Sequence, residues 1–243
     1  MKTLADEAQA AHLSRFFKTG PGEYGEGDRF LGIRVPFTRS IVKEYRRQAD
    51  LEDVSQLIAS PWHEIRLAGF LLLVELYAAA RRSERTRRQH PASGSCREIV
   101  DFYLASLERG NNWDLVDMVA PKILGDYLLT RPEERSLLHQ LAEMEGQLWH
   151  QRVAMVATWT LIRDHEYDDA LRLAARFLTH SHDLIHKASG WMLREIGKRG
   201  GSDLLTMFLD RHAAHMPRTM LRYSIEQLPE PRRQHYLRLK VER

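Results

Sequence analysis

The segment WDLVDMVA, residues 113 to 120, is the first of four similar segments that decide the fold. The later three share its pattern of apolar and charged residues: WHQRVAM at 149 to 155, IHKASG at 185 to 190 and MLRYSI at 220 to 225. Their alignment makes four charged residues equivalent, each 35 residues after the previous one: Asp117, Arg152, Lys187 and Arg222. A repeat of this length with two helices per unit predicts an α-solenoid, in which each helical hairpin buries its apolar face against its neighbours.

The rest of the chain shows the same helical spacing of apolar residues. Leu67, Phe70, Leu71 and Val74 are one example, and convincing β alternation is absent. Glycine and proline interrupt the pattern at short intervals, which predicts helices of roughly 10 to 20 residues with short connections. We therefore expect an all-α fold of about six helical pairs, with residues 1–243 forming a single repeat domain.

A polar insertion separates the first repeat from the second. Arg66 in WHEIRLAG lies 51 residues before Asp117, which exceeds one period by 16 residues. The run RRSERTRRQHPASGSC at 81 to 96 is also 16 residues long, so we expect it to be an insertion between two helices. Its arginine-rich part at 81 to 88 either adds phosphate contacts or forms a solvated loop, and the sequence does not decide between these.

The composition is that of a soluble globular protein with a modest basic excess. The chain is 43% hydrophobic, and nothing in it reaches the roughly 18 consecutive apolar residues of a membrane span. A net charge of +3 and a pI near 9.0 would help the protein to bind a polyanion, but they are not evidence that it does so. The N-terminal MKTLADEAQAAHLSRFF has no apolar core of a secretory signal. A single cysteine, Cys96, excludes an intrachain disulfide and a cysteine-based zinc cluster, which fits a reducing cytoplasm.

One charged position recurs near the start of the second helix of every unit. Stacking would align these side chains in one row on one surface: Arg66, Asp117, Arg152, Lys187 and Arg222. A solvated helix face is the plain interpretation, because any amphipathic repeat places polar residues at constant phase. Two indoles favour a ligand instead, since Trp113 lies one turn before Asp117 and Trp191 one turn after Lys187. The pattern indicates a cationic groove that contains one carboxylate and two tryptophans.

Four segments resemble one known family. They are FLGIRVP at 30 to 36, NNWDLVDMVAPKILGDYL at 111 to 128, WHQRVAMVAT at 149 to 158 and HKASGWMLREIG at 186 to 197. They are similar to segments of the HEAT-like-repeat DNA alkylation repair family, the AlkD-like alkylpurine DNA glycosylases, from about residue 10 to about residue 230. The resemblance implies a right-handed α–α superhelix with a concave DNA-binding face.

The resemblance also implies site residues. The family's catalytic aspartate resembles Asp117, its two tryptophans resemble Trp113 and Trp191, and its groove arginine resembles Arg152. The segment GEYGEGDRFLGIRVP at 22 to 36 resembles a family segment near the DNA. Together with the cationic positions of the row, this gives the expected DNA contacts: Tyr24, Arg34, Arg66, Arg152, Lys187 and Arg222.

The implied reaction is hydrolysis of the N-glycosidic bond of 3-methyladenine or 7-methylguanine in double-stranded DNA, as in base excision repair. Alkylation makes these purines cationic and good leaving groups, so the protein must chiefly stabilise the positive charge that develops on the sugar. Asp117 would do so and would position or deprotonate water, while Trp113 and Trp191 offer their π faces and Arg152 holds a phosphate. The family resemblance implies cleavage without a base-binding pocket, which would restrict activity to positively charged lesions.

No cofactor or metal is expected. Three histidines, His180, His182 and His186, suggest a metal site by spacing, but a solvated helix start explains them better. We expect a monomer in the cytoplasm, associated with the nucleoid. The alternative is a non-catalytic HEAT-repeat scaffold that binds DNA or protein without cutting; retention of Asp117 with both tryptophans argues against it.

Overall fold

The repeat in the sequence reappears in the helices of the computed structural model, which describes residues 1–86 and 95–239. Four helices begin 35 residues apart, at Trp113, Leu148, Asp183 and Arg218. The fifth residue of each is the charged residue of the aligned segments. Arg66 is instead the fourth residue of a helix that begins at His63, so it is one residue out of register with the later repeats.

The all-α prediction is confirmed. Between residues 1 and 86 and between 95 and 239 the backbone forms helices and turns, with no strand and only an isolated bridge between Arg29 and Trp62. The chain divides into two compact units, unit 1 (Met1–Val119) and unit 2 (Ala120–Arg243), and each is described by itself. That the whole chain forms a single repeat domain stays a prediction.

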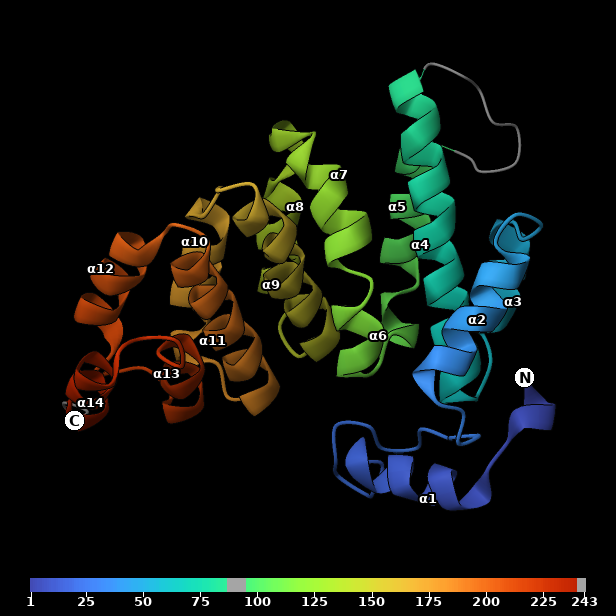
Figure 1. Cartoon of the computed structure of the whole chain (residues 1–243), viewed down its shortest axis with the longest axis horizontal. Helices are drawn as coiled ribbons and strands as arrows, with labels where there is room; N and C mark the ends of the chain where they lie inside the picture. Colours follow the sequence, from blue (N-terminus) through green and yellow to red (C-terminus); the bar gives the residue numbers. More distant parts are fainter. Residues whose placement is uncertain (87–94, 240–243) are drawn as a thin grey trace. The chain divides into compact units, whose positions relative to one another are not determined.

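Unit 1 is organised around one long helix (Figure 1). Its α-helices are α1 (Glu7–Phe16), α2 (Val35–Tyr45), α3 (Leu51–Ile58), α4 (His63–Thr86), α5 (Cys96–Ala105) and α6 (Trp113–Asp117). Short 3₁₀ turns occupy Lys2–Leu4 and Leu107–Arg109. Helices α2, α3 and α5 all pack on α4, whose apolar residues are mostly buried between Leu67 and Ala80.

The predicted insertion at 81 to 96 is partly helix. Residues 81 to 86 continue α4 to Thr86, and Cys96 is already the first residue of α5, so only the stretch between them separates the two helices. Ser95 caps α5 in a reciprocal capping box with Glu98, which satisfies the first backbone N–H groups. The arginines of this run at 87 and 88 lie outside the described residues.

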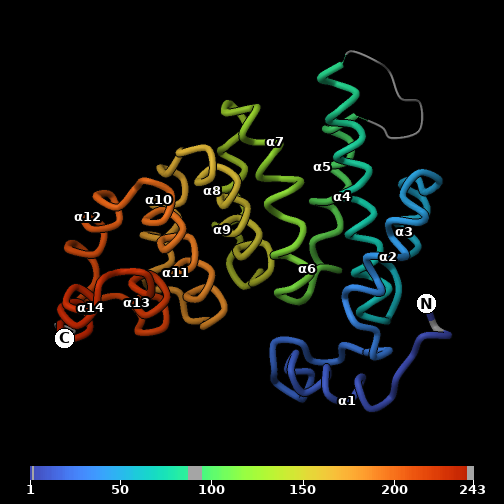
Figure 2. The backbone as a smooth tube through the Cα atoms, in the orientation of Figure 1, coloured from blue at the N-terminus to red at the C-terminus, as the bar shows by residue number. Residues whose placement is uncertain are grey.

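Unit 2 repeats a pattern of paired helices (Figure 2). After a π-helical turn, Pro121–Gly125, its α-helices are α7 (Asp126–Leu129), α8 (Ser136–Glu143), α9 (Leu148–Arg163), α10 (Asp168–Arg176), α11 (Asp183–Lys198), α12 (Ser202–His212), α13 (Arg218–Ser224) and α14 (Glu230–Arg238). Two 3₁₀ turns lie at Pro132–Glu134 and Phe177–Thr179. Helix α9 packs on α8, α10 and α11, and α11 also packs on α12 and α13.

A glycine permits a close helix contact in unit 2. A Cβ atom at Gly190 in α11 would lie 2.5 Å from the carbonyl oxygen of Met220 and 2.6 Å from Tyr223 Cβ, both on α13. Only glycine lets the two backbones approach this closely. Gly190 therefore fixes how α13 lies against the helix that carries Trp191.

Candidate active site

Helix α6 presents Trp113 and Asp117 one turn apart. Asn112 caps the helix in extended conformation, and its side-chain oxygen accepts a hydrogen bond from the Trp113 N–H at 2.9 Å. Leu115 and Val116 are buried, whereas Trp113 and Asp117 are both half-buried. The helix therefore turns its aliphatic side chains inward and leaves the indole and the carboxylate partly open to solvent.

A buried network of charged groups anchors α6 to α4. His63 Nε2 lies 2.9 Å from Asp114 Oδ2, and His63 Nδ1 lies 2.7 Å from Asp28 Oδ2. Arg66 Nη2 donates to Asp28 Oδ1 at 2.7 Å and to Asn111 Oδ1 at 2.9 Å. All these groups except Asn111 are buried, so the network is a fixed internal framework.

The pKa shifts of His63 and Asp28 both favour the charged forms of these two groups. Burial alone would lower the pKa of His63, but the two carboxylates outweigh burial and raise its pKa to about 9. Burial would raise the pKa of Asp28, but its hydrogen bonds and the positive charges of His63 and Arg66 lower it instead. At neutral pH His63 is an imidazolium between two carboxylates.

An aromatic stack continues from His63 to Trp113. The His63 ring lies 4.5 Å from Phe30, Phe30 stacks on Phe17 at 5.2 Å, and Phe17 stacks on Trp113 at 5.2 Å. Phe16 meets the indole edge to face at 5.9 Å. These contacts hold the indole on one side and leave its other parts partly exposed.

Glu64 holds the loop that leads into α2. Its carboxylate accepts hydrogen bonds from three successive backbone N–H groups, those of Leu31 at 2.9 Å, Gly32 at 2.8 Å and Ile33 at 3.1 Å. Gly32 has φ of 83°, and a Cβ atom there would lie 2.0 Å from the Asp6 carbonyl oxygen. The segment FLGIRVP therefore requires glycine at position 32, because the loop packs closely between the start of α1 and α4.

Two of the predicted DNA contacts, Tyr24 and Arg34, lie in the segment between α1 and α2. Tyr24 is half-buried in the loop after α1, and Arg34 is exposed at the N-cap position of α2. Arg66 differs from the prediction of an exposed cationic row, because it is 3% exposed and its guanidinium is bonded to Asp28, Asn111 and the carbonyls of Arg109 and Ser60. Arg66 therefore has a structural role inside unit 1.

An open cavity of about 430 Å³ lies beside Asp117 within unit 1. Trp113 and Asp117 line it together with Phe16 and Phe17, and Arg34 lies at its border. The cavity arises because α1 and the loop before α2 cover one side of α6. That the site works without a base-binding pocket stays a prediction.

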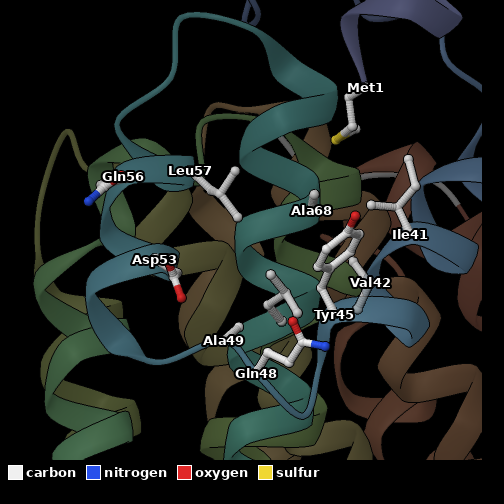
Figure 3. A pocket seen from close by; sticks show the side chains of 11 residues that line it. Met1, Ile41, Val42, Tyr45, Gln48, Ala49, Asp53, Gln56, Leu57 and Ala68 are labelled. Atoms are coloured by element: carbon white, nitrogen blue, oxygen red, sulfur yellow. The ribbon is translucent and has the colours of Figure 1, made fainter.

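A second cavity of about 680 Å³ lies between α2, α3 and α4 (Figure 3). Ile41, Tyr45 and Leu57 give it apolar walls, with Gln48 and Asp53 as polar groups. None of the site residues predicted from the sequence lines it.

Tyr103 of α5 is a buried tyrosine on which the charge of Asp117 acts. It is 1% exposed, its hydroxyl has no hydrogen-bond partner, and burial together with the negative charge of Asp117 raises its pKa. Nothing in the sequence pattern distinguishes this tyrosine from an ordinary core residue.

In unit 2, Arg152 is fixed against the start of α11. It is 5% exposed, and its Nη1 donates to the Leu184 carbonyl at 2.6 Å. Burial lowers the pKa of the neighbouring His182, and the charges of His186, Arg152 and Lys187 lower it further against the opposing effect of Asp183. Arg152 is thus a buried, immobilised cation and not part of a solvated row.

The remaining predicted residues of unit 2 are more accessible. Lys187 is half-buried and pairs with Asp183 at 2.9 Å, Trp191 is half-buried on α11, and Arg222 is exposed on α13. The structure places Trp113 and Asp117 together in unit 1, and it places Arg152, Lys187, Trp191 and Arg222 in unit 2.

The three histidines near the start of α11, His180, His182 and His186, make hydrogen bonds to the backbone and to Gln151. His182 caps the helix, His180 Nε2 bonds Gln151 Oε1 at 2.9 Å, and His186 Nε2 bonds the His180 carbonyl at 2.5 Å. In the part of the chain that the structure describes, no group of three histidine, cysteine or acidic side chains is arranged to hold a metal ion. These contacts fit the helix-start interpretation.

Sequence reasoning missed the group that organises unit 1. His63, Asp28 and Asp114 belong to none of the motifs that the sequence offered. A signal was present all the same: three charged or polar residues, His63, Glu64 and Arg66, open α4 just before its long apolar stretch. Such residues at a buried helix start need internal partners.

The comparisons with known proteins agree with this architecture. The family model described as DNA alkylation repair enzyme matches residues 1–228. The chain belongs to the DNA alkylation repair enzyme family. The family resemblance found in the sequence is thereby confirmed.

A solved structure shares the fold of this family member. A predicted DNA alkylation repair enzyme from Enterococcus faecalis superimposes with a TM-score of 0.70 at 19% identity, over 93% of this chain and 97% of that one. A comparison with curated proteins finds none that matches this chain. Within the described residues, no helix of this DNA alkylation repair family member is long and apolar enough to cross a membrane.

Proposed function

We propose that the protein is an alkylpurine DNA glycosylase, which hydrolyses the N-glycosidic bond of cationic N3- or N7-alkylated purines in duplex DNA. Membership of the DNA alkylation repair family supports a role in repairing alkylated DNA. The observation that carries the finer proposal is the placement of Asp117: a half-buried carboxylate one helical turn from Trp113, beside an open cavity. A scaffold protein would have no need of that arrangement.

Asp117 acts on the charge that moves to the sugar. An N-alkylated purine is already a good leaving group, so the reaction needs little acid catalysis. As the bond to C1′ breaks, the sugar becomes an oxocarbenium ion, and a preorganised carboxylate stabilises it. The same carboxylate positions the water that attacks C1′ and accepts its proton.

The indoles and Arg152 complete the proposal with the roles that the resemblance gives them. Trp113, held by Phe16 and Phe17, offers a π face to a cationic nucleotide, an attraction of roughly 0.5–2 kcal/mol. Trp191 does the same from α11. Arg152 binds a phosphate as a cation already fixed by the Leu184 carbonyl, so less side-chain entropy is lost on binding.

Affinity for DNA comes from cations at the surface. Arg222 and Lys187 of unit 2 and Arg34 of unit 1 are the proposed phosphate contacts, with Tyr24 beside the backbone. Arg66 is not among them, because its guanidinium is committed to Asp28. Binding to double-stranded DNA should fall steeply with salt. We further propose a monomer that works without metal or organic cofactor, in the cytoplasm at the nucleoid.

The test is release of free 7-methylguanine from duplex DNA by the purified protein, with Asp117→Asn and Asp101→Asn in parallel. Asp101 is a surface carboxylate on α5, paired with Arg97 at 2.9 Å, and serves as the matched control. We expect wild type and Asp101→Asn to release base at equal rates. Asp117→Asn should be slower by at least about tenfold, or roughly 1.4 kcal/mol of lost barrier lowering.

A wild-type protein that shifts DNA on a gel but releases no base above the spontaneous rate would overturn the enzymatic proposal. It would leave the alternative, a HEAT-repeat module that binds DNA without cutting it.

A further inference from the structure

Two imidazoles accept hydrogen bonds from the backbone at the start of α11. His182 Nδ1 accepts from the Leu184 N–H at 3.1 Å, and His180 Nδ1 accepts from the His182 N–H at 3.0 Å. Both N–H groups belong to the open start of the helix, where no earlier turn offers them a carbonyl. The two histidine side chains therefore serve as caps, a role that usually falls to asparagine, aspartate or serine.

These hydrogen bonds fix the protonation state of both rings. A ring nitrogen that accepts must carry a lone pair, so the single proton of each neutral ring is on Nε2. His180 fits this arrangement, because its Nε2 lies 2.9 Å from Gln151 Oε1, an oxygen that can only accept. The Gln151 amide is oriented by its Nε2, which donates to the Ala142 carbonyl at 3.3 Å. A protonated ring carries hydrogen on both nitrogens, so it can accept neither backbone bond.

The surroundings of the two rings oppose their protonation. The charged and titratable groups that act on them come from α9 and α11: Arg152, Asp183, His186 and Lys187. Helix α13 adds the uncharged Thr219, which is hydrogen-bonded to Asp183, and Phe177 meets the His180 ring edge to face at 5.7 Å. Burial first, and then the neighbouring histidine and cationic charges, lower the pKa of both rings, while Asp183 acts in the opposite direction on His182. The neutral form that the hydrogen bonds require is thus the form present at neutral pH.

Leu184 links the cap to Arg152. Its N–H is the group that His182 caps, and its carbonyl oxygen accepts from Arg152 Nη1 at 2.6 Å. Gln151, the partner of His180, directly precedes Arg152 on α9. Both histidines therefore hold the start of α11 against the part of α9 that carries the guanidinium.

We propose that His180 and His182 are positioning residues, which hold Arg152 in place for a DNA phosphate only as neutral imidazoles. This inference rests on the proposed glycosylase function and deepens it by adding a dependence on acid pH. When either ring gains a proton, its Nδ1 stops accepting, and the Leu184 carbonyl that fixes Arg152 is no longer held. Because the pKa of each ring lies below 6.5, the caps are fully formed above pH 6.5 and are lost as the pH falls through the pKa of the folded state.

Amide hydrogen exchange followed by NMR tests the caps without DNA. We would measure the protection factor of the Leu184 N–H at about pH 8 and about pH 5. In the wild type it should fall at least about fivefold in acid, which corresponds to the loss of one N-cap. His182→Asn keeps an acceptor oxygen that does not titrate, so its protection factor should fall less than about twofold. His215→Asn replaces an exposed histidine between α12 and α13 and should behave as the wild type.

Base release connects the caps to the reaction. We would measure release of 7-methylguanine from duplex DNA, less the spontaneous rate, as the ratio of the rate at about pH 5 to the rate at about pH 8. This ratio should be at least about threefold higher in His182→Asn than in the wild type, and His215→Asn should keep the wild-type ratio. Asp117 is present in all three proteins, so its titration cancels in the comparison.

The outcomes separate this inference from the proposed function. Equal Leu184 protection at both pH values in the wild type, or equal rate ratios for the wild type and His182→Asn, would overturn the inference and leave the glycosylase standing. A wild-type rate that rises in acid, with a His182→Asn rate that does not, would also overturn it, because protonated His182 would then act as a cation toward DNA. Loss of Leu184 protection in acid, in a protein that releases no base at either pH, would support the caps and overturn the glycosylase.

Discussion

His63 Nε2 lies 2.9 Å from Asp114 Oδ2, and this single contact ties the start of α4 to α6. Helix α6 has only five residues, too few to be stable alone. Asp114 directly follows Trp113 and precedes Asp117 by three residues, so whatever holds Asp114 also sets the positions of the indole and the candidate catalytic carboxylate. The contact is completely internal, because His63 is 1% exposed and Asp114 is 6% exposed.

Removing the imidazolium should destabilise the protein severely. His63→Leu leaves Asp114 buried without its cation and Asp28 with Arg66 alone. Breaking a buried charge network in this way costs about 3–5 kcal/mol. Urea unfolding followed by circular dichroism measures the loss. The matched control is His139→Leu in unit 2, where a half-exposed histidine faces Asp169 at 2.9 Å and the cost should stay below about 1 kcal/mol. Equal midpoints for the two variants would show that the network does not stabilise the fold.

The same histidine should make stability depend on alkaline pH. The pKa of His63 is raised from 6.5 to about 9, so its contribution is fully present below pH 6.5 and is lost as the pH rises through about 9. The wild type should therefore lose up to roughly 3 kcal/mol across this window. Asp28 has the opposite sign: its lowered pKa gives stability above pH 3.8 that is lost as the pH falls through the folded value.

Unfolding curves of wild type and His63→Leu between pH 6.5 and pH 9.5 check the alkaline effect, because the difference between them removes the titration of other groups. A constant difference over this range would contradict a raised pKa in the folded state.

Glu64 should control the loop before α2. Glu64→Gln replaces a carboxylate that accepts three backbone N–H bonds by an amide with one oxygen and an NH₂ group that cannot accept them. We expect a loss of about 1–3 kcal/mol and faster hydrogen exchange at Leu31, Gly32 and Ile33. Glu52→Gln on the exposed face of α3 should change neither quantity. Unchanged exchange at these three amides in Glu64→Gln would show that other contacts hold the loop.

The helices were predictable because periodicity is a local property of the sequence. The 35-residue spacing of the aligned segments matches the starts of α6, α9, α11 and α13. The spacing of Trp113 and Asp117 on one helix face followed from the same periodicity. The burial of Arg66 did not, since its partner Asp28 is 38 residues away in the chain and no repeat relates the two.

The cavity was equally beyond prediction. Its walls come from α1 and the loop before α2, which lie outside the repeats, and from α6. A period constrains only how one repeat packs on the next, and it contains no information on the segment that covers the first one. Phe16 and Phe17 lie almost 100 residues before Trp113 in the chain, and only the fold brings them to it.

Gly190 should tolerate no side chain. In Gly190→Ala the new Cβ would meet backbone and Cβ atoms of α13 at 2.5 and 2.6 Å, which cannot move without shifting that helix. Overpacking of this kind costs about 1–3 kcal/mol. Gly197→Ala on the same helix is the control, because its Cβ would meet mainly Leu205 Cδ2, the end of a flexible side chain, while alanine favours the helix by about 0.5–1 kcal/mol. Thermal unfolding of both variants measures the difference in stability. A Gly190→Ala protein as stable as Gly197→Ala would show that α13 can shift to accommodate the new side chain.

Two arginines of the predicted row should behave in opposite ways. Arg222 is exposed on α13, so Arg222→Ala should leave stability unchanged and weaken binding to an undamaged duplex. Loss of one phosphate contact reduces the slope of log K against log salt by about 0.9. Arg66 is buried against Asp28, so Arg66→Ala should cost about 3–5 kcal/mol of stability. At temperatures where that variant remains folded, its salt slope should equal that of the wild type.

A salt series of fluorescence anisotropy measurements on one duplex, with unfolding curves for each variant, provides both readouts. Suppose that Arg66→Ala kept wild-type stability and reduced the slope of log K against log salt by about 0.9. Arg66 would then be a phosphate contact, and the row of exposed charged residues predicted from the sequence would be correct. The structure predicts the reverse, because a guanidinium already bonded at 2.7 Å to a buried carboxylate cannot reach a phosphate without leaving that carboxylate uncompensated.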